Sequence, residues 1–202
     1  MFYQPEDGSG LPHDPFKAIV SPRPIGWIST LDADGVANLA PYSFFNALAD
    51  KPPMVMFSST GKKGDQDYAK DTVANVRATG EFVANIVSYD LREAMNASAA
   101  VLPRGVDEFE HAGLTKAASE VIAAPRVAEA PAALECRLFQ IIDLPGGINH
   151  MVIGEVVGIH LSDAAIHDGI FDVTQYKPLS RLGYMDYDVT TEVFKMPRPQ
   201  GM

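Results

Sequence analysis

The stretch RPIGWISTLDADGVANLAPYSFFN, from Arg23 to Asn46, decides the fold class of this chain. After the arginine, "PIGWISTL" alternates with a period of two residues, which is the pattern of a β-strand. Residues 32–35 (DADG) predict a hairpin turn in which Gly35 can adopt a positive φ. Residues 36–40 (VANLA) continue as the partner strand. Since Pro41 lacks a backbone N–H, we expect the chain to leave the sheet over residues 40–53.

The rest of the chain contains more strand patterns than helix patterns. Further strands are predicted at residues 54–59, 81–87, 134–144 and 150–161, and helices at about 73–79 and 90–100. Asp71 or Thr72 can cap the first of these helices, and Gly80 suits the position after its end. The sequence therefore predicts a mainly β fold, a small and mostly antiparallel barrel with helical additions.

Composition restricts the class of protein. The chain has 202 residues, of which 47% are hydrophobic, and we expect a single domain of residues 1–202 with peripheral arms at 1–20 and 188–202. Its formal net charge of -10 argues against binding nucleic acid or anionic membranes. A single cysteine, and the lack of a signal-peptide pattern at the start, make a cytoplasmic protein the expectation.

One segment could hold an anion despite the acidic charge. Lys70 stands just ahead of the Asp71/Thr72 cap of the helix at about 73–79, and Lys62 and Lys63 stand in a glycine loop before it. A helix N-terminus with one or two fixed cations is a common phosphate site. Arg23 and the hydroxyl pair Ser29–Thr30 could contribute from the first strand. The alternative is that these are surface lysines beside an ordinary helix cap.

The segment APYSFFN, residues 40–46, could bind a planar heterocycle. Extended backbone beside Pro41 has N–H and C=O groups that could pair with the edge of such a ring. Ser43 and Asn46 add side-chain donors, and the aromatic residues could pack on the ring, although core packing is their usual role.

Motifs for side-chain catalysis are scarce. The sequence contains no HExxH, CxxC or GxSxG pattern. His160 and His167 have aspartates nearby, so a metal site is conceivable, but a solvated acidic loop is the preferred interpretation and no metal is predicted. Cys136 stands in a strand pattern without an identifiable base, which favours a buried structural thiol.

Seven segments, taken in order, resemble the flavin reductase-like, FMN-binding split-barrel family, in the branch that includes flavoredoxin. They are RPIGWISTLDADGVANLAPYSFFN (Arg23–Asn46), PPMVMFSS (Pro52–Ser59), KDTVANVRATGEFVANIV (Lys70–Val87), GVDEFEHAGLT (Gly105–Thr115), PRVAEAPAALECRL (Pro125–Leu138), INHMVIGEVVGIH (Ile148–His160) and RLGY (Arg181–Tyr184). Each motif alone is weak, but the ordered set is specific.

The resemblance implies a six-stranded Greek-key split β-barrel, a homodimer, and one FMN per subunit near the dimer interface. In relatives, the segments matching Ser29–Thr30 and Ala40–Asn46 line the flavin, and those matching Ser58–Ser59 and Lys70–Thr72 serve the phosphate and ribityl chain. With the residues discussed above, the candidate cofactor-binding set is Arg23, Ser29, Thr30, Ala40, Pro41, Tyr42, Ser43, Phe44, Asn46, Ser58, Ser59, Lys70, Asp71, Thr72, Arg181 and Tyr184.

His150 is the candidate catalytic residue. Relatives often have Gly-Asp-His here, with the histidine near the nicotinamide or flavin, whereas this chain has Asn149 before His150. Losing that carboxylate removes a possible orienting partner for the imidazole. We predict an NAD(P)H:flavin oxidoreductase that passes hydride from the nicotinamide to FMN. The alternatives are an FMN-binding electron carrier without its own NAD(P)H site, or a barrel that binds another planar or phosphorylated ligand or serves as a scaffold.

Overall fold

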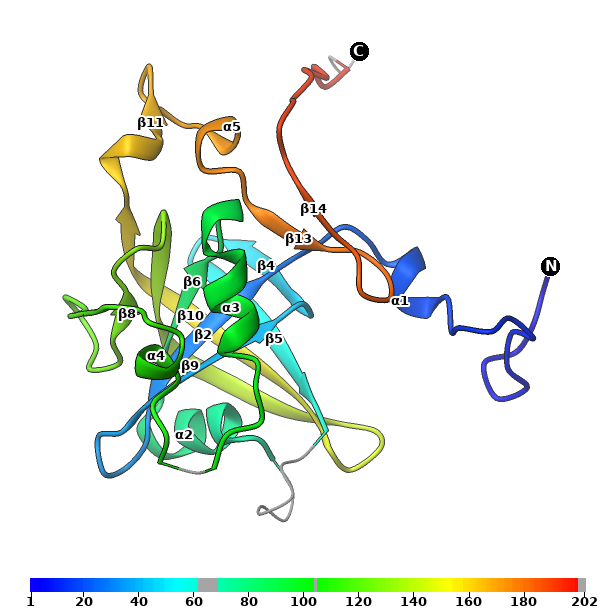
Figure 1. Cartoon of the computed structure of the whole chain (residues 1–202), viewed down its shortest axis with the longest axis horizontal. Coiled ribbons are helices and arrows are strands. Elements are labelled where there is room, and N and C mark those ends of the chain that lie inside the picture. The colour runs from blue at the N-terminus through cyan, green and yellow to red at the C-terminus, as the bar shows by residue number, and fades with distance from the viewer. Residues whose placement is uncertain (62–68, 104, 200–202) are drawn as a thin grey trace.

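The computed structural model describes residues 1–61, 69–103 and 105–199. Lys62 and Lys63, which were expected near a phosphate, lie outside the described residues. The main feature is a seven-stranded antiparallel sheet with the order β3-β2-β6-β9-β10-β5-β4 (Figure 1). Its strands are β2 (Gly26–Leu31), β3 (Ala37–Tyr42), β4 (Phe45–Asp50), β5 (Pro53–Thr60), β6 (Glu81–Ile86), β9 (Ala132–Leu144) and β10 (Asn149–Leu161). The expected mainly β fold is confirmed.

Shorter elements surround this sheet. The helices are α1 (Phe16–Ile19), α2 (Asp71–Thr79), α3 (Arg92–Ala97), α4 (Glu108–His111) and α5 (Val173–Tyr176), with 3₁₀ turns η1 (Tyr89–Leu91) and η2 (Asp163–Ala165). The remaining strands are β1 (Arg23–Pro24), β7 (Lys116–Ala117), β8 (Arg126–Val127), β11 (Ile166–His167), β12 (Ile170–Phe171), β13 (Leu179–Arg181) and β14 (Tyr187–Val189). None of the helices in the described ranges is long and apolar enough to cross a membrane.

All seven strands contribute to one core, so the sheet curves around a common interior. The contributing residues are Ile28, Tyr42, Phe45, Phe57, Phe82, Cys136 and Val152. Val73 and Val76 of α2 join the same core, and Figure 1 shows α2 at one end of the sheet. The sheet has seven strands where six were expected. Within the described ranges β3 and β4 remain edge strands, so hydrogen bonds do not close the sheet into a ring.

The β2–β3 hairpin forms as expected. The Asp32 carboxylate accepts the backbone N–H groups of Asp34 at 2.9 Å and Val36 at 2.8 Å, and Gly35 has a φ of 82°. A side chain that accepts both amides makes the reversal tight. The hairpin therefore fixes the register between β2 and β3, from Gly26 opposite Tyr42 to Leu31 opposite Ala37.

The prediction that residues 40–53 leave the sheet is wrong. Pro41 is paired with Trp27 inside β3, and residues 45–50 form β4 against β5. Pro41 is tolerated because β3 is an edge strand, where a missing N–H need not remove a ladder hydrogen bond. Only Ser43 and Phe44 interrupt the two strands. This short break directs β4 to the opposite edge of the sheet from β3.

Helix α2 starts earlier than the sequence indicated. Its N-cap residue is Lys70, whose side chain makes no capping hydrogen bond, so Asp71 and Thr72 belong to the first turn instead of capping it. Gly80 follows the last turn with a φ of 73°, which confirms the expected end. The earlier start buries Thr72 between the helix and the sheet.

A small separate sheet, β1-β13-β14, joins the two ends of the chain to the body. The guanidinium of Arg23 is buried and donates to the carbonyl oxygens of Lys17, Val20 and Leu182, the last at 2.6 Å. It thereby ties the N-terminal segment to the segment that follows β13. In Figure 1 the residues before α1 and after β14 run away from the body.

Candidate functional site

A cleft of about 310 Å³ lies among β3, the start of α2, the residues that follow α3, and α4. Six of the expected cofactor-binding residues line it, namely Ala40, Pro41, Tyr42, Lys70, Asp71 and Thr72. Asn38, residues 98–102 and Glu108 complete its walls. The fold thus brings together two segments that lie about thirty positions apart in the sequence. A volume near 300 Å³ is in the range of small-molecule sites.

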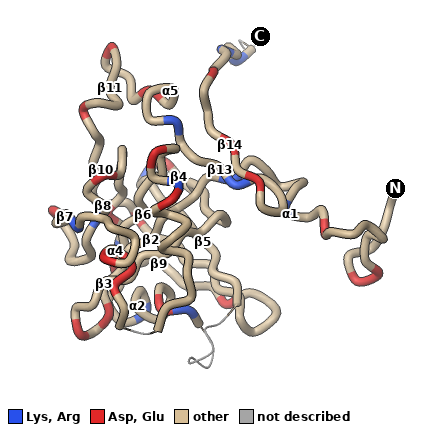
Figure 2. Tube along the Cα trace, in the orientation of Figure 1, with Lys and Arg blue, Asp and Glu red and all other residues tan. Residues whose placement is uncertain are grey.

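One end of this cleft favours an anion. The N–H groups in the first turn of a helix have no intrahelical acceptors and carry partial positive charge. Lys70 is exposed at this end, and partial desolvation lowers the pKa of its ammonium group. Figure 2 shows acidic residues spread over most of the trace and a basic segment at the start of α2. The electrostatics therefore differ locally from the net charge of -10.

Two buried hydroxyls, those of Tyr42 and Ser59, lie close to one another near the cleft. Tyr42 is 6% exposed and Ser59 is fully buried, and neither Tyr42 Oη nor Ser59 Oγ has a hydrogen-bond partner of acceptable geometry among the described residues. Burial raises the pKa of Tyr42 to about 12, although the nearby hydroxyls of Thr72 and Ser59 lower it. Both oxygens have almost no accessible surface, so they do not face the open cleft.

The sequence reasoning missed Glu108 at this site. The side chain is only 8% exposed, lines the cleft, and accepts the backbone N–H of Leu39 on Oε2 at 3.1 Å. Asp107 caps α4 by accepting the N–H of Phe109, which fixes the direction of the helix. Nothing in the spacing of GVDEFEHAGLT distinguishes the buried Glu108 from the exposed Glu110.

His150 does have an orienting carboxylate, contrary to the expectation from Asn149. The two strands β9 and β10 place Asp143 directly opposite His150, and Nδ1 lies 2.7 Å from Asp143 Oδ1. Arg77 of α2 donates to the same oxygen at 2.8 Å. The hydrogen bond with His150, and then the charge of Arg77, lower the pKa of Asp143. Because the carboxylate comes from the neighbouring strand, only the register could reveal it.

His150 does not line the 310 Å³ cleft. It is buried, at 3% exposure, and pairs across β10 and β5 with Ser59. Cross-strand partners lie on the same face of a sheet. His150 is therefore a neighbour of Ser59, whose hydroxyl in turn lies near Tyr42.

The hydroxyls of Ser29 and Thr30 are used inside the fold. Ser29 Oγ donates to the carbonyl oxygen of Pro125 at 2.5 Å, and Thr30 Oγ1 accepts from Asn75 at 3.0 Å. Both residues are fully buried and neither lines the cleft. They fix β2 against α2 and against the segment before β8.

The expected residues at the β3–β4 junction lie beyond the cleft lining. Ser43 and Phe44 are half-buried, and Phe44 accepts the N–H of Ser58 at 2.7 Å. Asn46 is exposed and its side-chain oxygen accepts the N–H of Ala47. These residues connect Tyr42 at the end of β3 to β4, which pairs with β5.

Arg181 and Tyr184 lie in the small sheet with Arg23. The Arg181 guanidinium donates to the Tyr187 hydroxyl and to the carbonyl of Tyr184, and stacks on the Tyr187 ring at 4.4 Å. Tyr184 has a φ of 56° and is half exposed beside His13. These residues hold the turn between β13 and β14, and they do not line the cleft of this chain.

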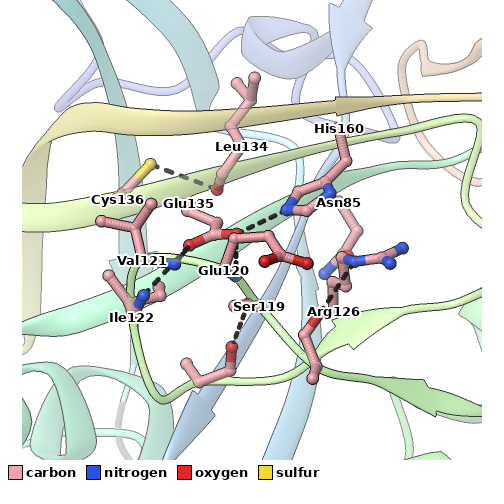
Figure 3. Close-up of polar contacts among 12 residues, drawn as sticks. Asn85, Ser119, Glu120, Val121, Ile122, Arg126, Leu134, Glu135, Cys136 and His160 are labelled. Carbon is pink, nitrogen blue, oxygen red and sulfur yellow. Dashed lines mark hydrogen bonds and ion pairs between the residues drawn. The ribbon is translucent and has the colours of Figure 1, made fainter.

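His160 contacts a buried carboxylate. Its Nε2 lies 2.5 Å from the carboxylate of Glu135, which is fully buried and also accepts backbone N–H groups of residues 120–122 (Figure 3). Within the described ranges, no group of three or more His, Cys, Asp or Glu side chains is placed to hold a metal ion. Cys136 is buried as expected, and burial raises the pKa of its thiol.

Comparisons with known proteins agree with this arrangement. A family model described as "Flavin reductase like domain" matches residues 20–180. An uncharacterized protein of Aquifex aeolicus is 41% identical over 166 residues, covering 82% of this chain and 83% of that protein. The crystal structure of nitrilotriacetate monooxygenase component B from Bacillus cereus is similar with a TM-score of 0.87 and 34% identity, covering 97% of this chain and 98% of that one.

A second solved structure is similar over almost the same range. Pseudomonas fluorescens 2-nitrobenzoate 2-nitroreductase NbaA matches with a TM-score of 0.81 and 30% identity, covering 93% of this chain and 90% of its own. The family model spans most of the present chain, including every strand of the large sheet. The chain therefore belongs to the flavin reductase-like family.

Proposed function

We propose that this protein binds FMN in the cleft between β3 and α2 and acts as an NAD(P)H-dependent flavin oxidoreductase. The observation that carries the proposal is one cleft that joins the anion-favouring start of α2 to the extended β3 backbone from Ala40 to Tyr42. FMN has the matching parts, since it joins a phosphate to a flat heterocycle through a polar chain. The names of similar proteins, a monooxygenase component and a nitroreductase, are consistent with redox chemistry.

Lys70 and the first turn of α2 would hold the phosphate. The ammonium group supplies a fixed positive charge, and the amides of Asp71 and Thr72 point along the helix start. The backbone of residues 40–46 would run along the ring edge, with Ser43 and Asn46 as side-chain donors and Phe44 against the ring. Four further residues of the candidate set would hold these strands in place from inside the fold, namely Ser29, Thr30, Ser58 and Ser59.

The bound ring supplies the hydride-accepting centre, so no side chain must act as a nucleophile. The protein would exclude water from one face and leave the other open to the nicotinamide. His150, oriented by Asp143, is buried outside the cleft, so its proposed role is to position its neighbour Ser59 behind the cleft wall. Because Asp143 replaces the carboxylate missing at Asn149, the reason for preferring an electron carrier without an NAD(P)H site is weaker.

We also propose, from the family resemblance, that the protein is a homodimer and that its sheet is a split Greek-key barrel. In the single chain, Arg23 and Arg181 lie in the small sheet and Tyr184 in the turn between β13 and β14, all outside the cleft. Their proposed role at a cofactor therefore requires a second subunit, with its cleft against this sheet.

Trp27 provides the first test. It is the only tryptophan, and its indole N–H donates at 2.8 Å to Ser98 Oγ, at the wall of the cleft. FMN should quench its fluorescence saturably, and the loaded protein should oxidise NADH or NADPH faster than free FMN does. Bound FMN that only dithionite reduces would instead indicate a flavoredoxin-like electron carrier. Failure to bind FMN at all would refute the proposal.

A further inference from the structure

A second cavity, of about 460 Å³, lies on the outer face of the large sheet. Residues from 126 to 130 and the end of β10 line it, and it shares no lining residue with the cleft. Its floor is Ala133 of β9, which pairs with Asn85 of β6 on one side and with His160 of β10 on the other. Because Leu134, the next residue of β9, packs against the core inside the curved sheet, Ala133 faces outwards.

Buried polar side chains hold the segment that covers this face of the sheet. The side-chain oxygen of Asn85 accepts the backbone N–H of Val127 at 2.8 Å, and the Glu135 carboxylate accepts those of residues 120–122 (Figure 3). Asn85 and Glu135 are both fully buried. A shift of the segment would leave these groups unpaired in the interior, so they specify one position for it. The backbone that carries Arg126 is therefore fixed relative to the sheet.

Arg126 offers hydrogen-bond donors to the cavity. Its Nε donates to the carbonyl oxygen of Ala118 at 3.1 Å, which orients the guanidinium. Its two Nη groups make no hydrogen bond or ion pair with any residue in the described ranges, and neither group is buried. A guanidinium with two free Nη groups can bind a carboxylate through two parallel hydrogen bonds.

His160 offers an acceptor to the same cavity. Its Nε2 lies 2.5 Å from the Glu135 carboxylate, which can only accept, so Nε2 carries the proton of the neutral imidazole (Figure 3). The other ring nitrogen, Nδ1, is then an acceptor, and it has no partner in the part of the chain that the structure describes. Since 21% of the side chain is exposed and Nδ1 is not buried, a ligand in the cavity can reach it.

The charges of the lining restrict the ligand. Glu129 also lines the cavity, so a phosphate with two negative charges, or a second carboxylate, would be repelled. One carboxylate matches Arg126, and a hydroxyl beside it can donate to His160 Nδ1. We propose that Arg126 and His160 form a second ligand site, for a small hydroxy monocarboxylate, on the outer face of the sheet. This site is independent of the flavin site proposed above.

The test compares lactate with propionate, which has the same skeleton without the hydroxyl. Dissociation constants are measured by NMR titration of the ¹⁵N-labelled full chain at pH 8, which favours the neutral imidazole. The variants are Arg126→Gln and His160→Phe. Arg137→Gln is the matched control, because Arg137 is an exposed arginine of β9 outside the cavity lining and its loss changes the net charge equally.

Lactate should bind severalfold more tightly than propionate, with shift changes confined to residues 118–130 and 158–162. Arg126→Gln should weaken lactate binding by about tenfold or more, as expected for a hydrogen bond between charged groups, and Arg137→Gln should not. His160→Phe should bind lactate no better than propionate. If His160→Phe does not fold, nuclear Overhauser effects between the lactate methyl group and the His160 ring in the unmodified chain decide its role.

Three results would overturn the proposal. The unmodified chain could fail to bind lactate, Arg126→Gln could bind it as tightly as the control does, or lactate and propionate could bind equally. FMN titration of Arg126→Gln keeps the two sites apart, since FMN affinity should equal that of the unmodified chain. A chain that binds lactate as expected but not FMN would refute the flavin site alone.

Discussion

Replacing Glu135 with glutamine should destabilise the fold strongly although the two side chains have nearly the same shape. Glu135 Oε1 receives the Glu120 N–H at 2.7 Å and His160 Nε2 at 2.5 Å. Oε2 receives the N–H groups of Val121 at 2.7 Å and Ile122 at 3.1 Å (Figure 3). The four contacts hold the loop before β8 against the sheet formed by β9 and β10.

Glutamine keeps one oxygen and presents an NH₂ group at the other position. The NH₂ group cannot accept a hydrogen bond, so at least one of the three backbone N–H groups loses its acceptor, and each buried unsatisfied donor costs about 1–3 kcal/mol. We therefore expect the free energy of unfolding to fall by about 2 kcal/mol. Gly158 lies opposite Glu135 with little spare room, since a Cβ there would stand 3.2 Å from the carboxyl carbon.

Urea denaturation at pH 7, followed by Trp27 fluorescence, measures this difference. Glu155→Gln is the matched control, because Glu155 is an exposed glutamate on β10, and its free energy of unfolding should stay within about 0.5 kcal/mol of the original. A loss below about 0.5 kcal/mol for Glu135→Gln would show that the loop contacts contribute little, and would refute the reasoning.

The pH dependence gives a second measurement on the same residue. Burial alone would raise the pKa of Glu135, but its hydrogen bonds outweigh burial and the net shift is downward from 4.5. The folded state therefore binds this proton less readily than the unfolded state. The stabilisation from Glu135 is complete above the ordinary glutamate pKa and is lost as pH falls through the lower folded value. The difference between the original chain and Glu135→Gln should accordingly shrink in acid.

Three further predictions concern the cleft, the histidine and the core. Lys70→Gln should weaken FMN binding by about tenfold and leave riboflavin binding nearly unchanged, as measured by fluorescence titration, because only FMN has the phosphate; equal losses for both would contradict this. Asp143→Asn should reduce NADH- or NADPH-dependent FMN reduction severalfold in stopped-flow assays, with FMN affinity retained, since His150 loses its orienting carboxylate; unchanged rates would argue against that role. Gly154→Ala should lower stability in urea by about 1–3 kcal/mol, because its Cβ would stand 2.5 Å from the Phe82 ring; a neutral result would mean that the ring moves freely.

The large elements follow from local patterns. Strand patterns predicted β2, β3, β5, β6, β9 and β10 but not β4, and the DADG turn fixed the first hairpin. Gly80 marked the end of α2, because a residue with a positive φ at this position favours glycine. Pro41 led to a wrong prediction, because the missing N–H of a proline disrupts a central strand but is tolerated in an edge strand. Whether β3 lies at an edge depends on the strand order of the whole sheet.

By itself, then, the sequence determined the β-rich class, the hairpins, the family resemblance and the pairing of APYSFFN with KDT as parts of one candidate site. Only the tertiary structure decided which polar groups meet. Asp143 reaches His150 through the register of β9 and β10, and Glu108 reaches Leu39 across 69 positions of sequence. Secondary-structure patterns report interactions between near neighbours in the chain, whereas these contacts arise from how the curved sheet brings distant segments together around one core.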